Sequence, residues 1–217
     1  MNKRQFFENP AEEWDRKHAC PQEEERLEKI IQHFPLKRGI AVLDIGCGTG
    51  RLIPYLRQQL GPNGWLVEAD FSAKMLRIGR SKYSASMVFF LQTDAQAVGL
   101  RSGLFDLIIC FALFPHLDNK LQALFEFRRL LRPGGNLIIA HPLGRRELDR
   151  LHSQKSEVIK KDFLPAGPEM KKLLFQSGFR EIIIVDAREM YLVKAVASSS
   201  ETQEGLWLLG GEERRLS

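Results

Sequence analysis

The chain has 217 residues, of which 44% are hydrophobic and 27% charged, with a formal net charge of +5. This length fits one domain with short additions, and the apolar, mixed-charge composition excludes a disordered or collagen-like chain. The sequence has no apolar stretch of transmembrane length, and its first residues lack the apolar core of a secretory signal. Cys20, Cys47 and Cys110 lie far apart, which argues against a disulfide framework and a cysteine-ligated zinc site. We therefore expect a cytoplasmic protein.

The elements expected from the sequence are a helical first segment and then a repeating βα pattern. Residues 1–36 are polar and helical in pattern, with Phe6, Phe7 and Trp14 as the large apolar residues. From Ile40 onward, short apolar runs alternate with helical patterns, which is typical of βα units around a parallel sheet. The expected strands are 41–45, 65–69, 87–91, 105–111, 136–141, 180–185 and 191–197, and the expected helices are 51–60, 73–81, 121–131, 144–155 and 168–177.

This order of elements predicts an α/β fold, a Rossmann-like doubly wound seven-stranded sheet with helices on both faces. Most of the expected strands are apolar throughout, as strands covered on both faces are. The last two are separated by a few residues, so we expect a C-terminal antiparallel hairpin on a mostly parallel sheet. A ligand of such a sheet binds at the carboxyl ends of the strands. We divide the chain into an N-terminal helical segment, 1–36, a domain, 37–197, and a flexible C-terminal tail, 198–217.

The strongest motif is a glycine-rich loop, VLDIGCGTG, at 42–50. A buried strand runs into Gly46, Gly48 and Gly50, and glycines let the backbone bend tightly and let a ligand approach it closely. The helix that follows offers unpaired N–H groups to a polar ligand. The third glycine of the dinucleotide fingerprint GxGxxG would fall at Arg51, so the motif disfavours NAD and FAD.

Acidic residues follow the next two strands. Asp70 ends the second expected strand, where a carboxylate accepts hydrogen bonds from the ribose hydroxyls of a nucleoside. Asp94 and Ala95 follow the third strand. Together with the glycine loop, these residues predict an adenosine-containing ligand across the strand ends.

Four blocks of the sequence, taken in order, resemble the class I S-adenosylmethionine-dependent methyltransferases: VLDIGCGTG, VEADFSAKML, TDAQAVGLRSGLFDLIIC and RRLLRPGGNLIIAHP. The likeness covers about residues 6–197 and is nearest in character to the small-molecule branch that includes the quinone C-methyltransferases. The resemblance implies S-adenosyl-L-methionine as cofactor, S-adenosyl-L-homocysteine as product, and methyl transfer to an O, N, S or C atom of a small-molecule acceptor.

The resemblance also implies the residues that bind the cofactor. The glycine loop would hold the methionyl part, Asp70 the ribose and Asp94 the adenine amino group, with Phe111 or Ala112 on the methionine side. The opening FFENPAEEWD resembles the helical lid of many members, and a helix merely packed on the sheet is an equal alternative. The cofactor contacts expected in this way are Asp44, Gly46, Gly48, Gly50, Asp70, Phe71, Met75, Asp94, Ala95 and Phe111.

Histidines after the fourth and fifth strands are the candidates for catalysis. His116 follows the fourth strand and His141 ends the fifth, so both are expected at the edge where an acceptor binds. Histidine can act as a general base near neutral pH, and we take His116 or His141 as the catalytic residue. Together with His152 and Asp162 they could instead ligate a metal ion, although no tight pair of histidines anchors such a site. Locally hydrogen-bonded imidazoles are the third interpretation.

Other side chains leave alternatives open. Cys110 in the fourth strand could be a thiol beside the reacting methyl group, but a lone cysteine in a buried strand is usually a small hydrophobic residue. Arg145 and Arg146 could receive an anionic substrate or lie in solvent. Two rival functions are an RNA methyltransferase, favoured only by the basic charge, and a non-catalytic cofactor-binding protein, which fold alone does not exclude. The spread of basic residues disfavours nucleic acid as a partner; the acceptor and the oligomeric state stay open.

Overall fold

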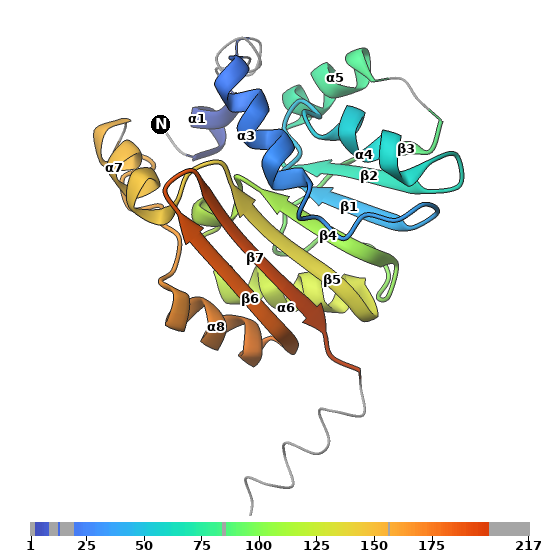
Figure 1. Cartoon of the computed structure of the whole chain (residues 1–217). Helices are drawn as coiled ribbons and strands as arrows, with labels where there is room; N and C mark the ends of the chain where they lie inside the picture. The colour runs from blue at the N-terminus through green and yellow to red at the C-terminus, as the bar shows by residue number, and fades with distance from the viewer. Residues whose placement is uncertain (1–2, 9–12, 14–19, 84–85, 156, 200–217) are drawn as a thin grey trace, which may run out of the picture.

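The computed structural model describes residues 3–8, 13, 20–83, 86–155 and 157–199. Their main feature is one seven-stranded sheet with the order β3-β2-β1-β4-β5-β7-β6, which confirms the predicted fold (Figure 1). The strands are β1 (Ala41–Ile45), β2 (Trp65–Asp70), β3 (Val88–Gln92), β4 (Phe105–Phe111), β5 (Leu131–His141), β6 (Phe179–Ala187) and β7 (Met190–Ala197).

The pairing of the strands brings the predicted site residues to one edge of the sheet. β1 pairs in parallel with β2 and β4, β2 with β3, and β4 with β5. β7 pairs antiparallel with β5 and β6, which confirms the C-terminal hairpin. Because the carboxyl ends of parallel strands share an edge, the glycine loop after β1, Asp70 on β2 and His141 on β5 lie along the same side.

Helices cover both faces of the sheet. The helices are α1 (Lys3–Glu8), α3 (Pro21–Ile31), α4 (Ile53–Leu60), α5 (Ala73–Lys82), α6 (Lys120–Leu130), α7 (Arg145–Lys155) and α8 (Gly167–Gln176). Figure 1 shows α3 and α4 in front of the sheet and α6 behind it. One apolar cluster joins Val42, Leu66 and Leu107 to α3 and α4, and the other joins Leu43 and Ile108 to α6 and α8.

Local sequence signals explain where α6 begins. The α6 helix buries Ala123, Leu124, Phe127 and Leu130 on one face, the spacing of an amphipathic helix. The Asn119 side chain caps its first turn by accepting a hydrogen bond from the Gln122 N–H at 3.0 Å, because a free N–H at a helix start needs a side-chain acceptor.

The structure differs from the sequence prediction at a few boundaries. The fifth strand begins at Leu131 rather than at residue 136, because Leu131 already pairs with Phe105 before the register shifts. The helix expected from residue 51 begins at Ile53, with Pro54 in its first turn. Part of the N-terminal segment, with Trp14, and residues 200–217 of the predicted tail lie outside the described residues.

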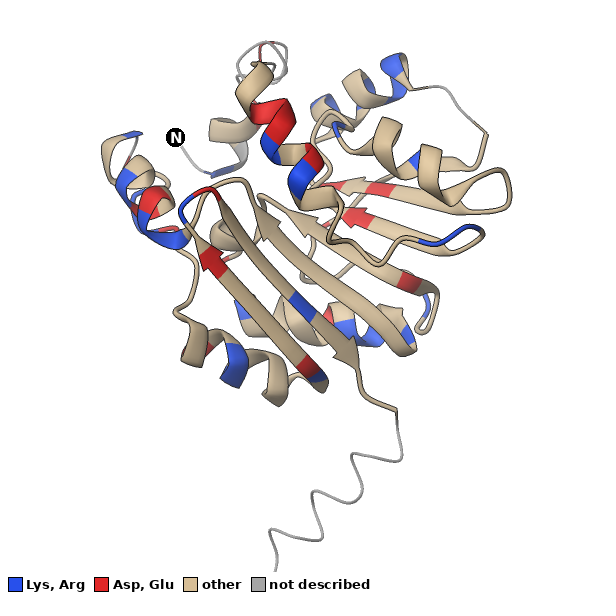
Figure 2. Ribbon diagram, in the orientation of Figure 1, with Lys and Arg blue, Asp and Glu red and all other residues tan. Residues whose placement is uncertain are grey.

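Charged residues are distributed over the surface. Figure 2 shows basic and acidic residues side by side on α3 and on α7. None of the described helices combines the length and the apolar character that crossing a membrane requires.

Candidate active site

The three glycines of the loop are needed for different structural reasons. All have positive φ, at 78° for Gly46, 55° for Gly48 and 80° for Gly50. A Cβ on Gly46 would stand 2.7 Å from the Leu113 side chain, and one on Gly50 would stand 2.5 Å from Ile53. A Cβ on Gly48 would meet no atom within 4 Å. The loop therefore packs tightly at its two ends and presents an open backbone surface in the middle.

Asp70 is bound directly to this open part of the loop. Its Oδ2 accepts a hydrogen bond from the Gly48 N–H at 2.9 Å, and its Oδ1 accepts one from the Ser72 N–H at 2.8 Å. Burial raises the pKa of Asp70, and the backbone hydrogen bonds from Ser72 and Gly48 oppose this effect. A carboxylate has about four lone-pair sites, so these contacts leave acceptor capacity for the hydroxyls of a ribose.

The remaining predicted cofactor contacts lie at or shortly after the carboxyl ends of β2, β3 and β4. Met75 is buried in the first turn of α5, and Phe71 is half-buried. Asp94 is exposed, and its Oδ1 accepts a hydrogen bond from the Gln96 N–H at 2.8 Å. Ala95 beside it is buried, and Phe111 at the end of β4 is half-buried.

A pair of buried carboxyl groups lies beneath the glycine loop. Asp44 on β1 is the in-register neighbour of Glu68 on β2, and the two residues are 1% and 0% exposed. Among the described residues, Oδ1 of Asp44 has no hydrogen-bond partner, and Glu68 has at most the weak thiol donor of Cys47. Burial and the neighbouring Asp70 raise the pKa of Asp44 to about 8, and burial with Asp44 raises that of Glu68. Asp44 was expected in the site, whereas Glu68 read as an ordinary strand residue.

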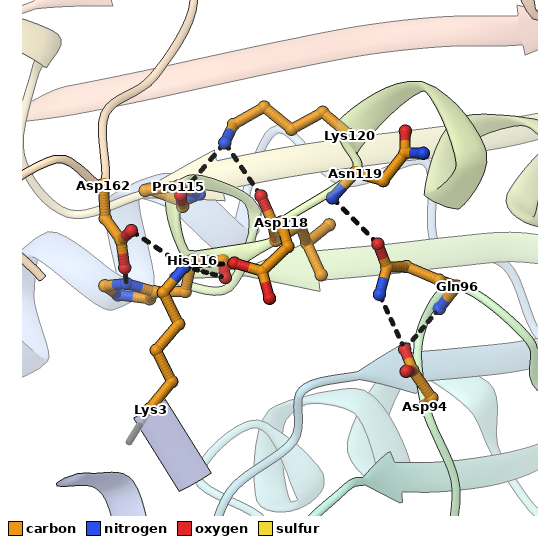
Figure 3. A network of polar contacts seen from close by, with 10 residues as sticks. Lys3, Asp94, Gln96, Pro115, His116, Asp118, Asn119, Lys120 and Asp162 are labelled. Carbon is orange, nitrogen blue, oxygen red and sulfur yellow. Dashed lines mark hydrogen bonds and ion pairs between the residues drawn. The ribbon is translucent and has the colours of Figure 1, made fainter. Parts of the chain in front are cut away.

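On the acceptor side, the structure brings His116 and Asp162 together. His116 Nδ1 lies 2.8 Å from Asp162 Oδ2, as Figure 3 shows. His152 Nδ1 is 2.5 Å from the Asp162 carbonyl oxygen, and the rings of His116 and His152 are 5.1 Å apart. These three residues come from separate segments, and the sequence had grouped them with His141, whose hydrogen bonds are instead with Leu143.

The charges of this pair suit a neutral imidazole beside an ionised carboxylate. Burial lowers the pKa of His116 below 6.5, and the hydrogen bond to Asp162 offsets part of this effect. Burial acts to raise the pKa of Asp162, but the hydrogen bonds from His116 and Lys3 outweigh it and hold that pKa below 3.8. With Nδ1–H donated to Asp162, the lone pair of His116 lies on Nε2.

His141 has a different environment. Its Nδ1 lies 3.0 Å from the Leu143 backbone nitrogen and 3.2 Å from the Leu143 carbonyl oxygen, so the ring is held by its own local backbone. Burial, with a smaller effect of His116, lowers the pKa of His141 to about 3. His141 is therefore neutral near pH 7 and a poor base.

The structure bears on three alternatives that the sequence left open: a metal site, a reactive thiol at Cys110, and an anion site at Arg145 and Arg146. No group of His, Cys, Asp and Glu side chains with metal-binding geometry occurs within the described part of the chain. The Cys110 thiol is completely buried, and burial raises its pKa, so it is a core side chain. Arg145 lies 3.6 Å from Asp186 in an ion pair, while Arg146 is exposed.

The first helix contacts both halves of the site, which the sequence did not specify. Lys3 Nζ lies 2.7 Å from Asp118 Oδ1 and 2.9 Å from Asp162 Oδ1. The Phe7 ring packs edge-on against His116 at 4.8 Å and against Phe71 at 6.5 Å. The sequence signal for these contacts was the opening FFENPAEEWD, which resembles a helical lid.

These features fit the cofactor that the sequence predicted. The open surface at Gly48 gives room for a ligand to approach the backbone, and the Asp70 carboxylate beside it can accept hydrogen bonds from a ribose. Residues 42–135 match a family model described as "Methyltransferase domain". This part of the chain is therefore a methyltransferase domain. Every expected cofactor contact of this methyltransferase domain falls inside the matched region.

Known proteins similar to this chain include quinone methyltransferases. The ubiquinone/menaquinone biosynthesis C-methyltransferase UbiE of Hahella chejuensis is 38% identical over 114 residues, 50% of this chain and 45% of that protein. The demethylmenaquinone methyltransferase of Staphylococcus aureus is 30% identical over 137 residues, 61% of this chain and 56% of that protein. The chain thus spans about half the length of the curated relatives it matches.

The fold is shared with solved methyltransferase structures. A SAM-dependent methyltransferase from Aquifex aeolicus has a TM-score of 0.70 at 23% identity, covering 87% of this chain and 97% of that one. This match extends well beyond residues 42–135 and includes most of the sheet.

Proposed function

We propose that this protein transfers a methyl group from S-adenosyl-L-methionine to a small-molecule acceptor. The observation that carries the proposal is the open backbone at Gly48, bound to Asp70, on the same edge of the sheet as the His116–Asp162 pair. When bound, the cofactor supplies a methyl group on a positively charged sulfur, which needs positioning more than covalent help.

The residues of the loop edge would hold the cofactor. The glycine loop and Asp44 would take its methionyl part, Asp70 the two ribose hydroxyls, and Asp94 the adenine amino group. The other contacts proposed from the sequence are Phe71, Met75, Ala95 and Phe111. Support comes from their common position after β1, β2, β3 and β4.

His116 would be the base that removes a proton from the acceptor. Asp162 fixes the ring by accepting from Nδ1, so that Nε2 carries the lone pair. In other acid–base sites too, a carboxylate that accepts from one ring nitrogen orients the histidine. The same carboxylate stabilises the ring once it is protonated. His141, whose burial lowers its pKa to about 3, would contact the acceptor as a neutral ring instead of taking a proton.

The helix α1 would act as the lid. Lys3 and Phe7 connect it to the acceptor side at Asp162 and His116, and Phe7 also reaches Phe71 on the cofactor side. A lid at this place excludes water from the reacting atoms.

Ligand binding tests the cofactor assignment. We expect S-adenosylmethionine and S-adenosylhomocysteine to raise the melting temperature, with NADH as a control that does not. A ligand at 100 times its Kd adds about 2.7 kcal/mol to the free energy of unfolding, which corresponds to roughly 5–11 °C for a protein of this size. A folded sample that responds to none of the three would contradict the assignment.

Turnover tests the base. The assay measures S-adenosylhomocysteine formed with a panel of phenols, hydroquinones, amines and thiols. We expect His116→Ala to lower kcat by roughly 10²–10⁴-fold while the Kd for S-adenosylhomocysteine stays within twofold. The matched control is His33→Ala, because His33 is exposed and outside the site. Unchanged turnover in His116→Ala would remove this residue from catalysis.

A further inference from the structure

A cavity outside the candidate active site lies between α7, α3 and the turn that joins β6 to β7. Its volume is about 490 Å³, and its walls include Glu147, Arg150 and Leu151 of α7, Arg26 of α3, and Arg188 of the turn. Glu147, Arg150 and Leu151 are spaced three and four residues apart, so they share one face of α7. Leu148 and His152 of the same helix are buried, and this second face is the one that reaches Asp162.

The walls of the cavity are fixed to one another by contacts within the protein. The Gly144 N–H donates to the Arg188 carbonyl oxygen at 3.1 Å, and the Arg145 N–H donates to Asp186 Oδ1 at 2.9 Å. Arg26 of α3 forms an ion pair of 3.1 Å with Glu189 in the turn. The three elements are therefore joined before any ligand arrives.

The free charges in the cavity are mostly positive. The Arg26–Glu189 pair is neutral as a unit. Within the described part of the chain, the guanidinium groups of Arg150 and Arg188 have neither a hydrogen bond nor an ion pair, and Glu147 is the only acidic lining residue outside an ion pair. Guanidinium groups bind carboxylate and phosphate through two parallel hydrogen bonds. Two unpaired guanidinium groups and one unpaired carboxylate leave the cavity with a net positive charge, which favours binding of an anion.

The remaining walls indicate what the anion is attached to. Leu143 and Leu151 line the cavity beside the arginines and offer contact to an apolar body. We propose that the cavity binds an organic anion, a carboxylate or phosphate monoester joined to an apolar group, and that this anion is part of the methyl acceptor.

The connection to the acceptor comes through His141. The Leu143 residue that lines the cavity donates its backbone N–H to His141 Nδ1 at 3.0 Å. The cavity and the acceptor side of the site thus share a wall. This second half of the inference rests on the proposed function, whereas binding of an organic anion does not.

Calorimetric titration with defined anions tests the cavity. The probes are phenyl phosphate and benzoate, with inorganic phosphate and acetate as their counterparts without an apolar body. We expect the two organic anions to bind more tightly than their counterparts, and the tighter of the two identifies the anionic group. Binding of all four with equal affinity, or of none, would overturn the inference.

Variants of one helix and the facing turn locate the binding. We expect Arg150→Gln and Arg188→Gln each to weaken binding of the tighter organic anion tenfold or more, and Glu147→Gln to strengthen it. Arg146→Gln is the matched control, because Arg146 is an exposed arginine of the same helix and does not line the cavity. If the tighter organic anion binds equally well to wild type and both arginine variants, its site is elsewhere and the proposal fails.

Titration of S-adenosylhomocysteine on the same samples separates this inference from the proposed function. Binding of the cofactor product without binding of any organic anion contradicts only the cavity assignment. Binding of an organic anion without the cofactor product contradicts the proposed function and supports the cavity as an anion site. Once an acceptor is known, Arg150→Gln should raise its KM at least tenfold and leave kcat within about twofold.

Discussion

The buried Asp44 carboxyl gives a quantitative prediction about stability. We consider Asp44→Asn, which keeps the shape of the side chain and removes its charge. In the folded protein the pKa of Asp44 is about 8, against 3.8 for an unperturbed aspartate. A pKa that differs by one between the folded and unfolded states is worth about 1.36 kcal/mol. At pH 7 the folded state therefore carries a cost of roughly 4 kcal/mol for this group.

The sign of the pH dependence follows from the raised pKa. The folded state holds a proton that the unfolded state has already released, so this group contributes its full stability below about pH 4 and loses it as the pH rises towards 8. Asp44→Asn removes that loss. It also leaves amide hydrogens without partners, at a cost of about 1–3 kcal/mol. We therefore expect a net gain of about 1–3 kcal/mol at pH 7, and a gain at least about 2 kcal/mol smaller at pH 4.5.

Urea unfolding at several pH values measures this effect. The free energy of unfolding is compared between wild type and Asp44→Asn at pH 4.5, 6 and 7.5. Glu157→Gln is the control, because Glu157 is an exposed carboxylate and the substitution should change little at any pH. A difference between wild type and Asp44→Asn that is the same at pH 4.5 and pH 7.5 would refute the reasoning. We also expect weaker cofactor binding in the stabilised variant, since sites for function often cost stability.

Three further predictions concern the candidate site. Gly48→Ala should fold, with a backbone strain of about 1–2 kcal/mol from its positive φ. It should lose binding of S-adenosylhomocysteine, measured by titration. Gly46→Ala should instead be less stable to urea, because its Cβ would meet Leu113. Asp70→Asn should weaken that binding by roughly 10–100-fold, the worth of charge-assisted hydrogen bonds, and an unchanged Kd would argue against a ribose at this carboxylate. Wild-type kcat/KM should fall as the pH drops below the lowered pKa of the base, and Asp162→Asn should move this inflection to still lower pH, because Asp162 acts to raise that pKa.

The sequence predicted the sheet and the glycine loop well, because both depend on local patterns. Buried strands show as apolar runs, and the loop from Gly46 to Gly50 is recognisable from its spacing. The early start of β5 at Leu131 was missed, since its pairing with Phe105 depends on a neighbouring strand rather than on the residues around it.

The contacts around His116 were predicted only in part, because they join distant segments. The strand ends placed His116 near Asp162 in outline, but the 2.8 Å contact between the two side chains is visible only in the structure. Lys3 comes from the other end of the chain and has no signal in its surroundings. Glu68 looked like any strand residue, and only its register with Asp44 shows that two carboxyl groups lie together.

The place of α1 has a consequence for the order of events in each catalytic cycle. Phe7 lies against both Phe71 and His116, so in the proposed site a molecule entering or leaving either half would meet the same helix. For each turnover the Lys3 ion pairs with Asp118 and Asp162 would have to open and re-form. We expect cofactor exchange and acceptor exchange to be kinetically coupled, with departure of products rather than methyl transfer setting the steady-state rate.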